Sequence, residues 1–325
     1  MTFESPRIVF LDSATYGDMS LQRFSDRWNC TVYPVTTRAE TIQRLAGHPI
    51  AVTNKVAIDK NALNSPETRD LKLIAVAATG TDIIDREEAS RRGVKICNVP
   101  GYATQSVAQF TLAMMLQLAT QMGKYVDAVK TGEWQKSPIF SLLTFPTMEL
   151  SGKRLGIIGY GSIGQAVGQM ARGLGMEVLV AVRPGRSGSA PQGRVKLEQL
   201  LVQADIISLH CPLTADTRHL INAQSLALMK PTAFLINTAR GALVEDNALI
   251  DALRRKRLAG AALDVIAQEP PAADHPMILA ANELDNLIVT PHTAWSARET
   301  RERLLQEVEE NIAAFLQGRD RNRVA

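Results

Sequence analysis

Short apolar runs alternate with longer polar stretches along the first hundred residues of the chain. The apolar runs cover residues 8–11, 31–35, 50–52, 71–76 and 94–96. Runs of this length are typical of strands that are buried on both faces, and the polar stretches between them have the length of covering helices. The pattern therefore predicts a parallel sheet with helices on its faces.

The same rhythm starts again after residue 150, with stronger apolar runs. They cover residues 154–158, 178–182, 206–210, 233–237, 261–265 and 287–290. Six strands separated by helical stretches are the number that a complete dinucleotide-binding sheet contains. Between the two halves, the breaker pair Pro100–Gly101 is followed by a long helical stretch, 104–130. We expect this helix to bridge the halves and to offer a broad apolar surface to a second subunit.

A charged amphipathic stretch at 297–315 carries apolar side chains on one side, at Leu304, Val308, Ile312 and Phe315. We expect it to return to the first sheet, which makes the first domain discontinuous. The predicted fold is α/β, with two doubly wound parallel-sheet domains. Residues 1–100 together with 296–325 form the first domain, and residues 101–295 form the second.

Composition narrows the class of protein. A chain of 325 residues with 46% hydrophobic residues exceeds what one core usually organises. The formal net charge of +3 comes from scattered basic residues, which does not suggest a nucleic-acid partner. The three cysteines are too far apart for a disulfide framework or a metal site. Without a visible secretory signal or an apolar stretch of the ~20 residues that a membrane span needs, we expect a cytoplasmic protein.

A glycine-rich turn directly after the strand at 154–158 predicts a cofactor site. Gly159 permits a tight turn, Gly161 lets a pyrophosphate approach the backbone, and Gly164 lets helix and strand pack closely. The helix that opens at Ser162 and Ile163 presents free N–H groups to the negative charge. A methyltransferase with a nucleoside cofactor also has glycines here, so other residues must exclude that class.

The end of the second strand in this half bears on the choice of nicotinamide cofactor. NAD-binding sheets normally carry an acidic residue there, which binds the adenosine ribose. Here the position is occupied by Val182, followed by Arg183 and Arg186. Because no carboxylate repels a 2′-phosphate and two guanidinium groups can bind one, we expect NADP to be preferred, with NAD as the alternative.

Three polar residues follow strand ends in the second half: Arg240, Glu269 and His292. The carboxyl ends of parallel strands border the ligand crevice of an open α/β sheet. His292 can donate a proton to a carbonyl oxygen, and Glu269 can orient the imidazole and favour its protonated form. Arg240 can bind a substrate carboxylate through two parallel hydrogen bonds. Each residue alone has an ordinary explanation as a turn or surface residue, but their joint placement after three strand ends suits reduction of a 2-oxo acid.

At these residues the sequence resembles the D-2-hydroxyacid dehydrogenase family over nearly the whole chain. The motifs are GYGSIG with GLGM, CPLT, NTARG, DV followed by EP, and TPH. The resemblance implies a Rossmann-type cofactor domain and a flavodoxin-like substrate domain with a cleft between them, and a homodimer formed largely through the cofactor domain. Three features are similar to the glycerate dehydrogenase, or hydroxypyruvate reductase, branch: the stretch 98–116, the segment 132–150 with Trp134, and Trp295.

The resemblance also implies roles for further residues. Asn54, Thr79 and Gly80 are expected at the substrate, the last two through backbone N–H groups, and Asp264 at the nicotinamide carboxamide. Further cofactor contacts are expected at Thr104, Cys211, Pro212, Thr217, Thr238, Ala239 and His292.

Three functions stay open at this point. The first is reduction of hydroxypyruvate or glyoxylate to D-glycerate or glycolate. The second is reduction of a bulkier 2-oxo acid such as 2-ketogluconate; phosphite oxidation is disfavoured, because the phosphite enzymes of the family have a lysine where Thr79 stands. The third is a cofactor-sensing binding protein on the same fold, against which the retained Arg240, Glu269 and His292 argue.

Overall fold

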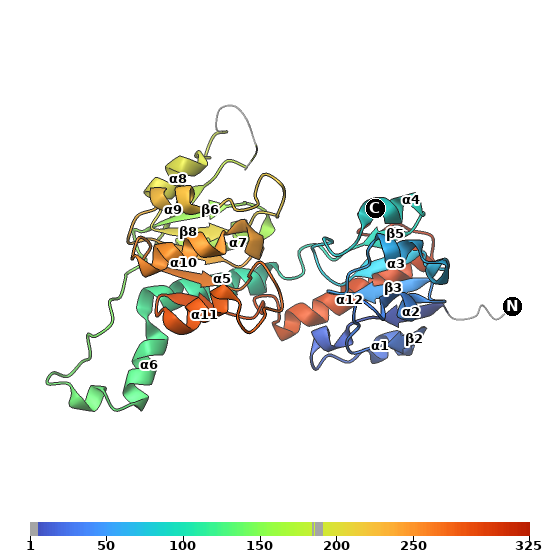
Figure 1. Cartoon of the computed structure of the whole chain (residues 1–325), viewed down its shortest axis with the longest axis horizontal. Coiled ribbons are helices and arrows are strands. Elements are labelled where there is room, and N and C mark those ends of the chain that lie inside the picture. The colour runs from blue at the N-terminus through green and yellow to red at the C-terminus, as the bar shows by residue number, and fades with distance from the viewer. Residues whose placement is uncertain (1–5, 184, 186–190) are drawn as a thin grey trace. The chain divides into compact units, whose positions relative to one another are not determined.

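The chain folds into two compact units (Figure 1). A computed structural model describes residues 6–183, 185 and 191–325. The first unit comprises Met1–Ala103 and Ser296–Ala325, and the second comprises Thr104–Trp295.

The first unit contains a five-stranded parallel sheet in the order β2-β1-β3-β4-β5. Its strands are β1 (Arg7–Phe10), β2 (Asn29–Val32), β3 (Ile50–Thr53), β4 (Leu73–Val76) and β5 (Lys95–Cys97). Its helices are α1 (Gln22–Ser25), α2 (Thr41–Leu45), α3 (Lys60–Asn64), α4 (Arg86–Arg91) and α12 (Arg298–Leu316), with short 3-10 helices η1 (Ser13–Tyr16) and η2 (Pro66–Thr68). This strand order is the flavodoxin-like one.

The second unit contains a six-stranded parallel sheet in the order β11-β10-β9-β8-β6-β7. Its strands are β6 (Arg154–Ile158), β7 (Glu177–Val180), β8 (Ile206–Leu209), β9 (Phe234–Asn237), β10 (Gly260–Leu263) and β11 (Leu287–Val289). Its helices are α5 (Thr104–Thr120), α6 (Met122–Lys130), α7 (Ser162–Gly173), α8 (Leu197–Gln203), α9 (Ala223–Leu228), α10 (Asp246–Arg254) and α11 (Pro276–Glu283), with 3-10 helices η3 (Trp134–Lys136) and η4 (Gly241–Leu243). The prediction of two doubly wound parallel sheets is confirmed.

One strand of the Rossmann arrangement is reduced to a single residue. Val195 forms an isolated parallel bridge with Ala181, just beyond β7, and so lies at the outer edge of the sheet. With this bridge counted as a third strand, the order is that of the dinucleotide-binding fold, in which the first strand lies between the second and the fourth.

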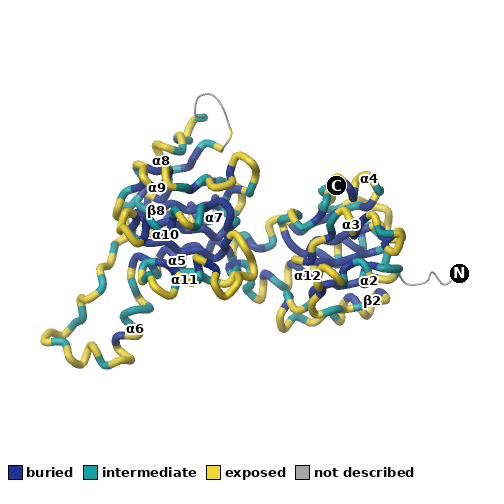
Figure 2. The backbone as a smooth tube through the Cα atoms, in the orientation of Figure 1, coloured by how far each residue is buried: buried dark blue, intermediate teal, exposed yellow. Residues whose placement is uncertain are grey.

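Burial explains why the apolar runs form these strands. Every residue of β3, β4, β8, β9 and β10 is buried, and Figure 2 shows the tube in dark blue at β8 and through the interior of each unit. In the second unit, alternate side chains enter two separate cores. One core packs against α5 and α7 and the other against α8 to α11. A sheet covered in this way needs no polar face, so its strands are continuously apolar.

The helix predicted at 104–130 is broken at Gln121. This residue has a left-handed backbone (φ 52°), and its side chain donates to the carbonyl of Leu118 at 2.8 Å, which caps the end of α5. The apolar side of α5 is used within the unit, since it packs against β9, β10 and α7. Seven large apolar side chains on α6 and the segment after it are exposed, from Met122 to Leu143, and Figure 1 shows this part of the chain extending away from the sheet of this unit.

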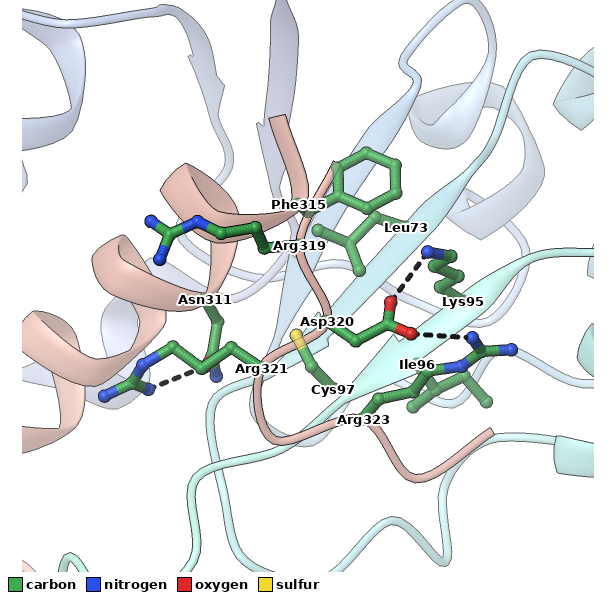
Figure 3. A pocket seen from close by; sticks show the side chains of 10 residues that line it. All are labelled: Leu73, Lys95, Ile96, Cys97, Asn311, Phe315, Arg319, Asp320, Arg321 and Arg323. Carbon is green, nitrogen blue, oxygen red and sulfur yellow. Dashed lines mark hydrogen bonds and ion pairs between the residues drawn. The ribbon is translucent and has the colours of Figure 1, made fainter. Parts of the chain in front are cut away.

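The C-terminal segment closes the edge of the first sheet. It pairs antiparallel with β5, where Val324 N donates to the carbonyl of Ile96 at 2.8 Å. Figure 3 shows Asp320 between Lys95 and Arg323, at 2.7 and 3.0 Å. Because the edge strand is paired and flanked by charge, it is protected from pairing with other chains. No helix in the described part of the chain combines the length and apolarity of a membrane span.

Candidate active site

Five strands of the second sheet end side by side, and a row of small and polar residues follows them. The last residues of β6, β8, β9, β10 and β11 lie in register. The next position along each strand is occupied by Gly159, His210, Thr238, Asp264 and Thr290. Thr238 shares a hydrogen bond with Thr111 of α5 at 3.0 Å, so this row lies on the α5 side of the sheet. Polar groups at this edge are where an open α/β sheet binds its ligand.

Two glycines of the turn after β6 are required for the backbone to fold as it does. Gly159 has a left-handed backbone (φ 94°), and a Cβ there would lie 2.4 Å from the backbone of His210 and Cys211. A Cβ on Gly164 would lie 2.2 Å from the carbonyl oxygen of Gly159. Both glycines therefore let the turn, β8 and α7 approach one another closely.

Gly161 has a different explanation. Any residue can adopt its backbone conformation (φ −77°), and a Cβ there would meet nothing within 4 Å. It stands at the N-terminus of α7, whose first N–H groups, from Ser162 and Ile163 onward, have no partner within the helix. Open space above unpaired N–H groups and a positive helix end suits a phosphate group that approaches the backbone. The turn therefore fits the pyrophosphate of a dinucleotide.

We predict that Gly161→Ala folds normally and binds the nicotinamide cofactor at least ~10-fold more weakly, since the added methyl group occupies the space of the pyrophosphate. Gly173→Ala is the matched control, because it lies in the same helix and its Cβ also meets nothing within 4 Å. Cofactor fluorescence titration and thermal melting separate the two effects. Equal cofactor affinity in both variants contradicts the assignment.

His292 and Glu269 form a close pair. The Nδ1 atom of His292 lies 2.6 Å from Oε2 of Glu269, while Oε1 accepts a hydrogen bond from the backbone of Ile266 at 3.0 Å. Both side chains are about one quarter to one third exposed, at 26% and 33%. Glu269 thus fixes the orientation of the imidazole and favours the tautomer with a proton on Nδ1. The other ring nitrogen, Nε2, is left for a ligand.

The turn that carries His292 is fastened to Asp264. His292 has a left-handed backbone (φ 54°), and its N–H donates to the carbonyl of Asp264 at 2.8 Å. The Asp264 carboxylate, 1% exposed, accepts from the hydroxyl of Thr290 at 2.6 Å and from the N–H groups of Thr293 and Ala294 at 3.0 and 2.8 Å. This buried carboxylate therefore holds the strained turn in shape.

Arg240 is placed by a second tight turn, after β9. The buried side chain of Asn237 accepts from the N–H of Ala239 at 3.0 Å and donates to the carbonyl of Arg240 at 2.9 Å. A Cβ on Gly241 would lie 1.9 Å from the backbone of Ile266, so only glycine lets this turn touch the segment that leads to Glu269. Arg240, Glu269 and His292 therefore come from three adjacent turns at one edge of the sheet. The motifs NTARG, DV…EP and TPH correspond to those turns.

A model of the family described as D-isomer specific 2-hydroxyacid dehydrogenase, NAD binding domain, matches residues 112–294. The chain is also 40% identical over 318 residues to the glycerate dehydrogenase of Methylorubrum extorquens, which covers 97% of this chain and 98% of that protein. The chain belongs to this family. It is accordingly a dehydrogenase with an NAD-binding domain.

Two further proteins extend the comparison. This chain is 35% identical over 319 residues to a hydroxypyruvate reductase of Blautia hydrogenotrophica, and the match covers 96% of this chain and 97% of that protein. A solved structure of an acyclic imino acid reductase in complex with NADPH and D-Arg has a TM-score of 0.85 and 29% identity, and covers 98% of this chain and 100% of that chain.

The other predicted cofactor residues follow β7, β8 and β9 along the chain or begin α5. Burial raises the pKa of Cys211 to about 11, so this residue is a neutral thiol. The hydroxyl of Thr217 donates to the carbonyl of Pro212 at 2.8 Å and so fixes the turn after β8. Thr104 opens α5, and Arg183 is exposed after β7, whereas Arg186 lies outside the described residues.

Of the predicted substrate residues, Asn54, Thr79 and Gly80 belong to the first unit, and Arg240 and His292 to the second. Asn54 follows β3 and is buried, 2% exposed, with no partner for its side-chain nitrogen Nδ2. The hydroxyl of Thr79 donates to the carbonyl of Val99 at 2.8 Å, and the side chain of Asn98 donates to the carbonyl of Thr79 at 2.7 Å. These contacts fix the backbone that leads into Gly80.

Three further residues in the described part of the chain were missed by the sequence reasoning. His210 shares a 2.8 Å hydrogen bond with the buried hydroxyl of Ser208, and burial lowers its pKa to about 4, so it is neutral at physiological pH. Arg194 places its guanidinium 5.1 Å from the ring centre of Tyr160 in the glycine turn. Asp12 follows β1 and is buried. The available signal was the position of Asp12 directly after the apolar run 8–11 and of His210 as the last residue of the run 206–210; for Arg194 there was none.

Proposed function

We propose that this dehydrogenase reduces a small 2-oxo acid, hydroxypyruvate or glyoxylate, to D-glycerate or glycolate, with NADPH as the preferred donor. The observation that carries the proposal is the 2.6 Å pair of His292 and Glu269 next to the turn of Arg240. The names of the relatives in Methylorubrum extorquens and Blautia hydrogenotrophica support the same substrate class.

A nicotinamide nucleotide held at the glycine turn of Gly159, Gly161 and Gly164 would supply the hydride, and the residues of the chain supply the proton and the orientation. The carbonyl carbon gains the hydride while its oxygen takes a proton from Nε2 of His292, which gives the 2-hydroxy acid and a neutral imidazole. Glu269 stabilises the imidazolium before the transfer through its contact with Nδ1. The ring then regains a proton from water.

Arg240 is assigned to the substrate carboxylate. Its planar guanidinium offers two parallel N–H groups that match the two carboxylate oxygens. A carboxylate held in this way keeps the neighbouring carbonyl oriented, and the positive charge favours the electron density that develops on the carbonyl oxygen. We assign Asn54, Thr79 and Gly80 of the first unit to the same substrate, and the unpartnered Nδ2 of Asn54 supports this.

The preference for NADPH rests on charge at the end of β7. Val182 leaves the position of the usual acidic residue without a carboxylate, and the exposed Arg183 follows it. Arg194 adds a guanidinium that stacks on Tyr160 and donates to the carbonyl of Ala181 at 3.3 Å. Positive charge at this place favours a ribose 2′-phosphate. The imino acid reductase with NADPH in its structure is consistent with this preference.

The proposal is tested by a screen of small 2-oxo acids with both reduced cofactors. We expect the highest kcat/KM with hydroxypyruvate or glyoxylate, and at least ~10-fold higher values with NADPH than with NADH. 2-Ketogluconate, and pyruvate with methylamine as an imine source, serve as comparison substrates. A strong bias to NADH contradicts the cofactor preference, and faster turnover of 2-ketogluconate or of the imine contradicts the substrate assignment.

We further propose that the enzyme is a cytoplasmic homodimer that pairs through the segment 122–150. This segment exposes a cluster of large apolar side chains, which is typical of a protein interface. The cluster consists of Met122, Val126, Val129, Trp134, Ile139, Phe140 and Leu143, of which Phe140 is 91% exposed. We expect light scattering to give twice the chain mass for the wild type and the single chain mass for Phe140→Asp/Leu143→Asp. A monomeric wild type contradicts the proposal.

A further inference from the structure

Asp12 is a buried carboxylate whose contacts differ from those expected at its position. It is separated from β1 by Leu11 and directly precedes the 3-10 helix η1, yet its side chain makes no capping hydrogen bond to that helix. Instead it reaches the turn after β3. Its oxygens accept from the N–H groups of Asn54 at 2.9 Å, Lys55 at 2.6 Å and Val56 at 3.3 Å. One side chain thus binds three consecutive backbone groups of another loop.

Burial in the folded protein disfavours the negative charge of the Asp12 carboxylate. Burial raises the pKa of Asp12, and the three backbone N–H groups together with the charge of Lys55 offset only part of this effect. The ionised carboxylate is therefore less stable here than in water. A second residue also holds the turn after β3. The hydroxyl of Thr53 accepts a hydrogen bond from Val56 N at 3.0 Å and donates one to Val56 O at 3.1 Å. The carboxylate of Asp12 and the hydroxyl of Thr53 thus hold the same turn together.

The turn that Asp12 holds carries an unsatisfied donor. The Nδ2 atom of Asn54 is buried and has no hydrogen-bond partner. A buried donor without an acceptor is rare in folded proteins and calls for an explanation. An oxygen of a bound ligand would supply the missing acceptor. Because Asp12 binds the N–H of Asn54 itself and of the two residues after it, the carboxylate sets the direction in which Asn54 Nδ2 points.

We propose that Asp12 is a positioning residue, which holds the turn of Asn54 so that Nδ2 donates to an oxygen of the bound 2-oxo acid. This inference rests on the proposed function, because the acceptor is the substrate. Asp12 touches neither substrate nor cofactor and acts only through Asn54. Loss of its carboxylate therefore weakens substrate binding and leaves cofactor binding unchanged.

The experiment is a double-mutant cycle with Asp12→Asn, Asn54→Ala and the double variant. KM for hydroxypyruvate and glyoxylate, the dissociation constant of NADPH and the melting temperature are measured for each. We expect Asp12→Asn and Asn54→Ala each to raise KM for the 2-oxo acid about 10-fold, without a change in NADPH affinity. The double variant is expected to match Asn54→Ala, because two residues that act as a unit are not additive.

Asp85→Asn is the matched control. Asp85 also lies in the first unit, and its carboxylate accepts a backbone hydrogen bond, from Glu88 N at 2.9 Å. We expect it to lower the melting temperature without changing KM. If Asp12→Asn does not fold, Asp12→Glu replaces it, since the longer side chain keeps the charge and displaces the turn.

Two failures are distinguishable. A wild type that reduces no 2-oxo acid contradicts the proposed function and this inference together. An active wild type whose KM stays within twofold after substitution of Asp12, or a double variant whose KM increase is the product of the two single increases, contradicts this inference alone.

Discussion

Replacement of His292 by Gln lowers kcat for reduction of the 2-oxo acid by at least ~100-fold, while the affinity for NADPH stays close to that of the wild type. Glutamine keeps the polarity and approximate size of the side chain but has no proton that it can give up at neutral pH. General acid catalysis by a positioned side chain contributes about 10²–10⁴-fold, which sets the expected loss. Steady-state kinetics and fluorescence titration of NADPH measure the two quantities.

His219→Gln is the control for this substitution. His219 is exposed, belongs to the same unit and has the same left-handed backbone as His292, with φ values of 51° and 54°. Any effect of placing glutamine in that backbone conformation is therefore shared by both variants. We expect wild-type turnover from His219→Gln. A His292→Gln enzyme that reduces the substrate at the parent's rate rejects His292 as the proton donor.

Replacement of Arg240 by Lys raises KM for the 2-oxo acid by about 10–100-fold and changes kcat less. An ammonium group keeps the positive charge but cannot form the two parallel hydrogen bonds that a guanidinium makes to a carboxylate. Arg255→Lys is a suitable control, since Arg255 is an exposed residue of the same unit that pairs with Asp251. A KM close to the parent's in Arg240→Lys means that Arg240 does not bind the substrate carboxylate.

The sheets were predictable from the sequence because a strand buried on both faces is apolar throughout. The predicted run at 206–210 overlaps β8, and that at 233–237 overlaps β9, to within one residue. The single-residue strand at Val195 leaves no comparable run. The break at Gln121 was also not predictable, because glutamine is a good helix former and its left-handed conformation depends on a local cap.

For the candidate site, the sequence indicated residues that follow apolar runs but could not show which of them meet. His292 and Glu269 are 23 positions apart, and their contact depends on the Asp264 carboxylate and on the missing side chain of Gly241. Asp12 reaches Asn54 across 42 positions. Such contacts between the ends of different strands are set by sheet order, which periodicity alone does not encode.

Arg194 illustrates a further limit. It precedes Val195 in a polar loop that gives no signal of its own, and it comes to the glycine turn only because Val195 pairs beside β7. The sequence could point to Arg183 and Arg186 through their proximity to Val182. A residue that reaches the same place from the next loop requires the fold.

The measurement that tests the central claim most directly is a crystal structure of the enzyme with NADPH and a non-reacting 2-oxo acid analogue such as oxamate. We predict that Nε2 of His292 lies within hydrogen-bonding distance of the oxo oxygen, about 2.6–3.2 Å, and that the Arg240 guanidinium binds both carboxylate oxygens. An analogue bound next to the nicotinamide with His292 turned away from it, or with its carboxylate on other residues, contradicts the account.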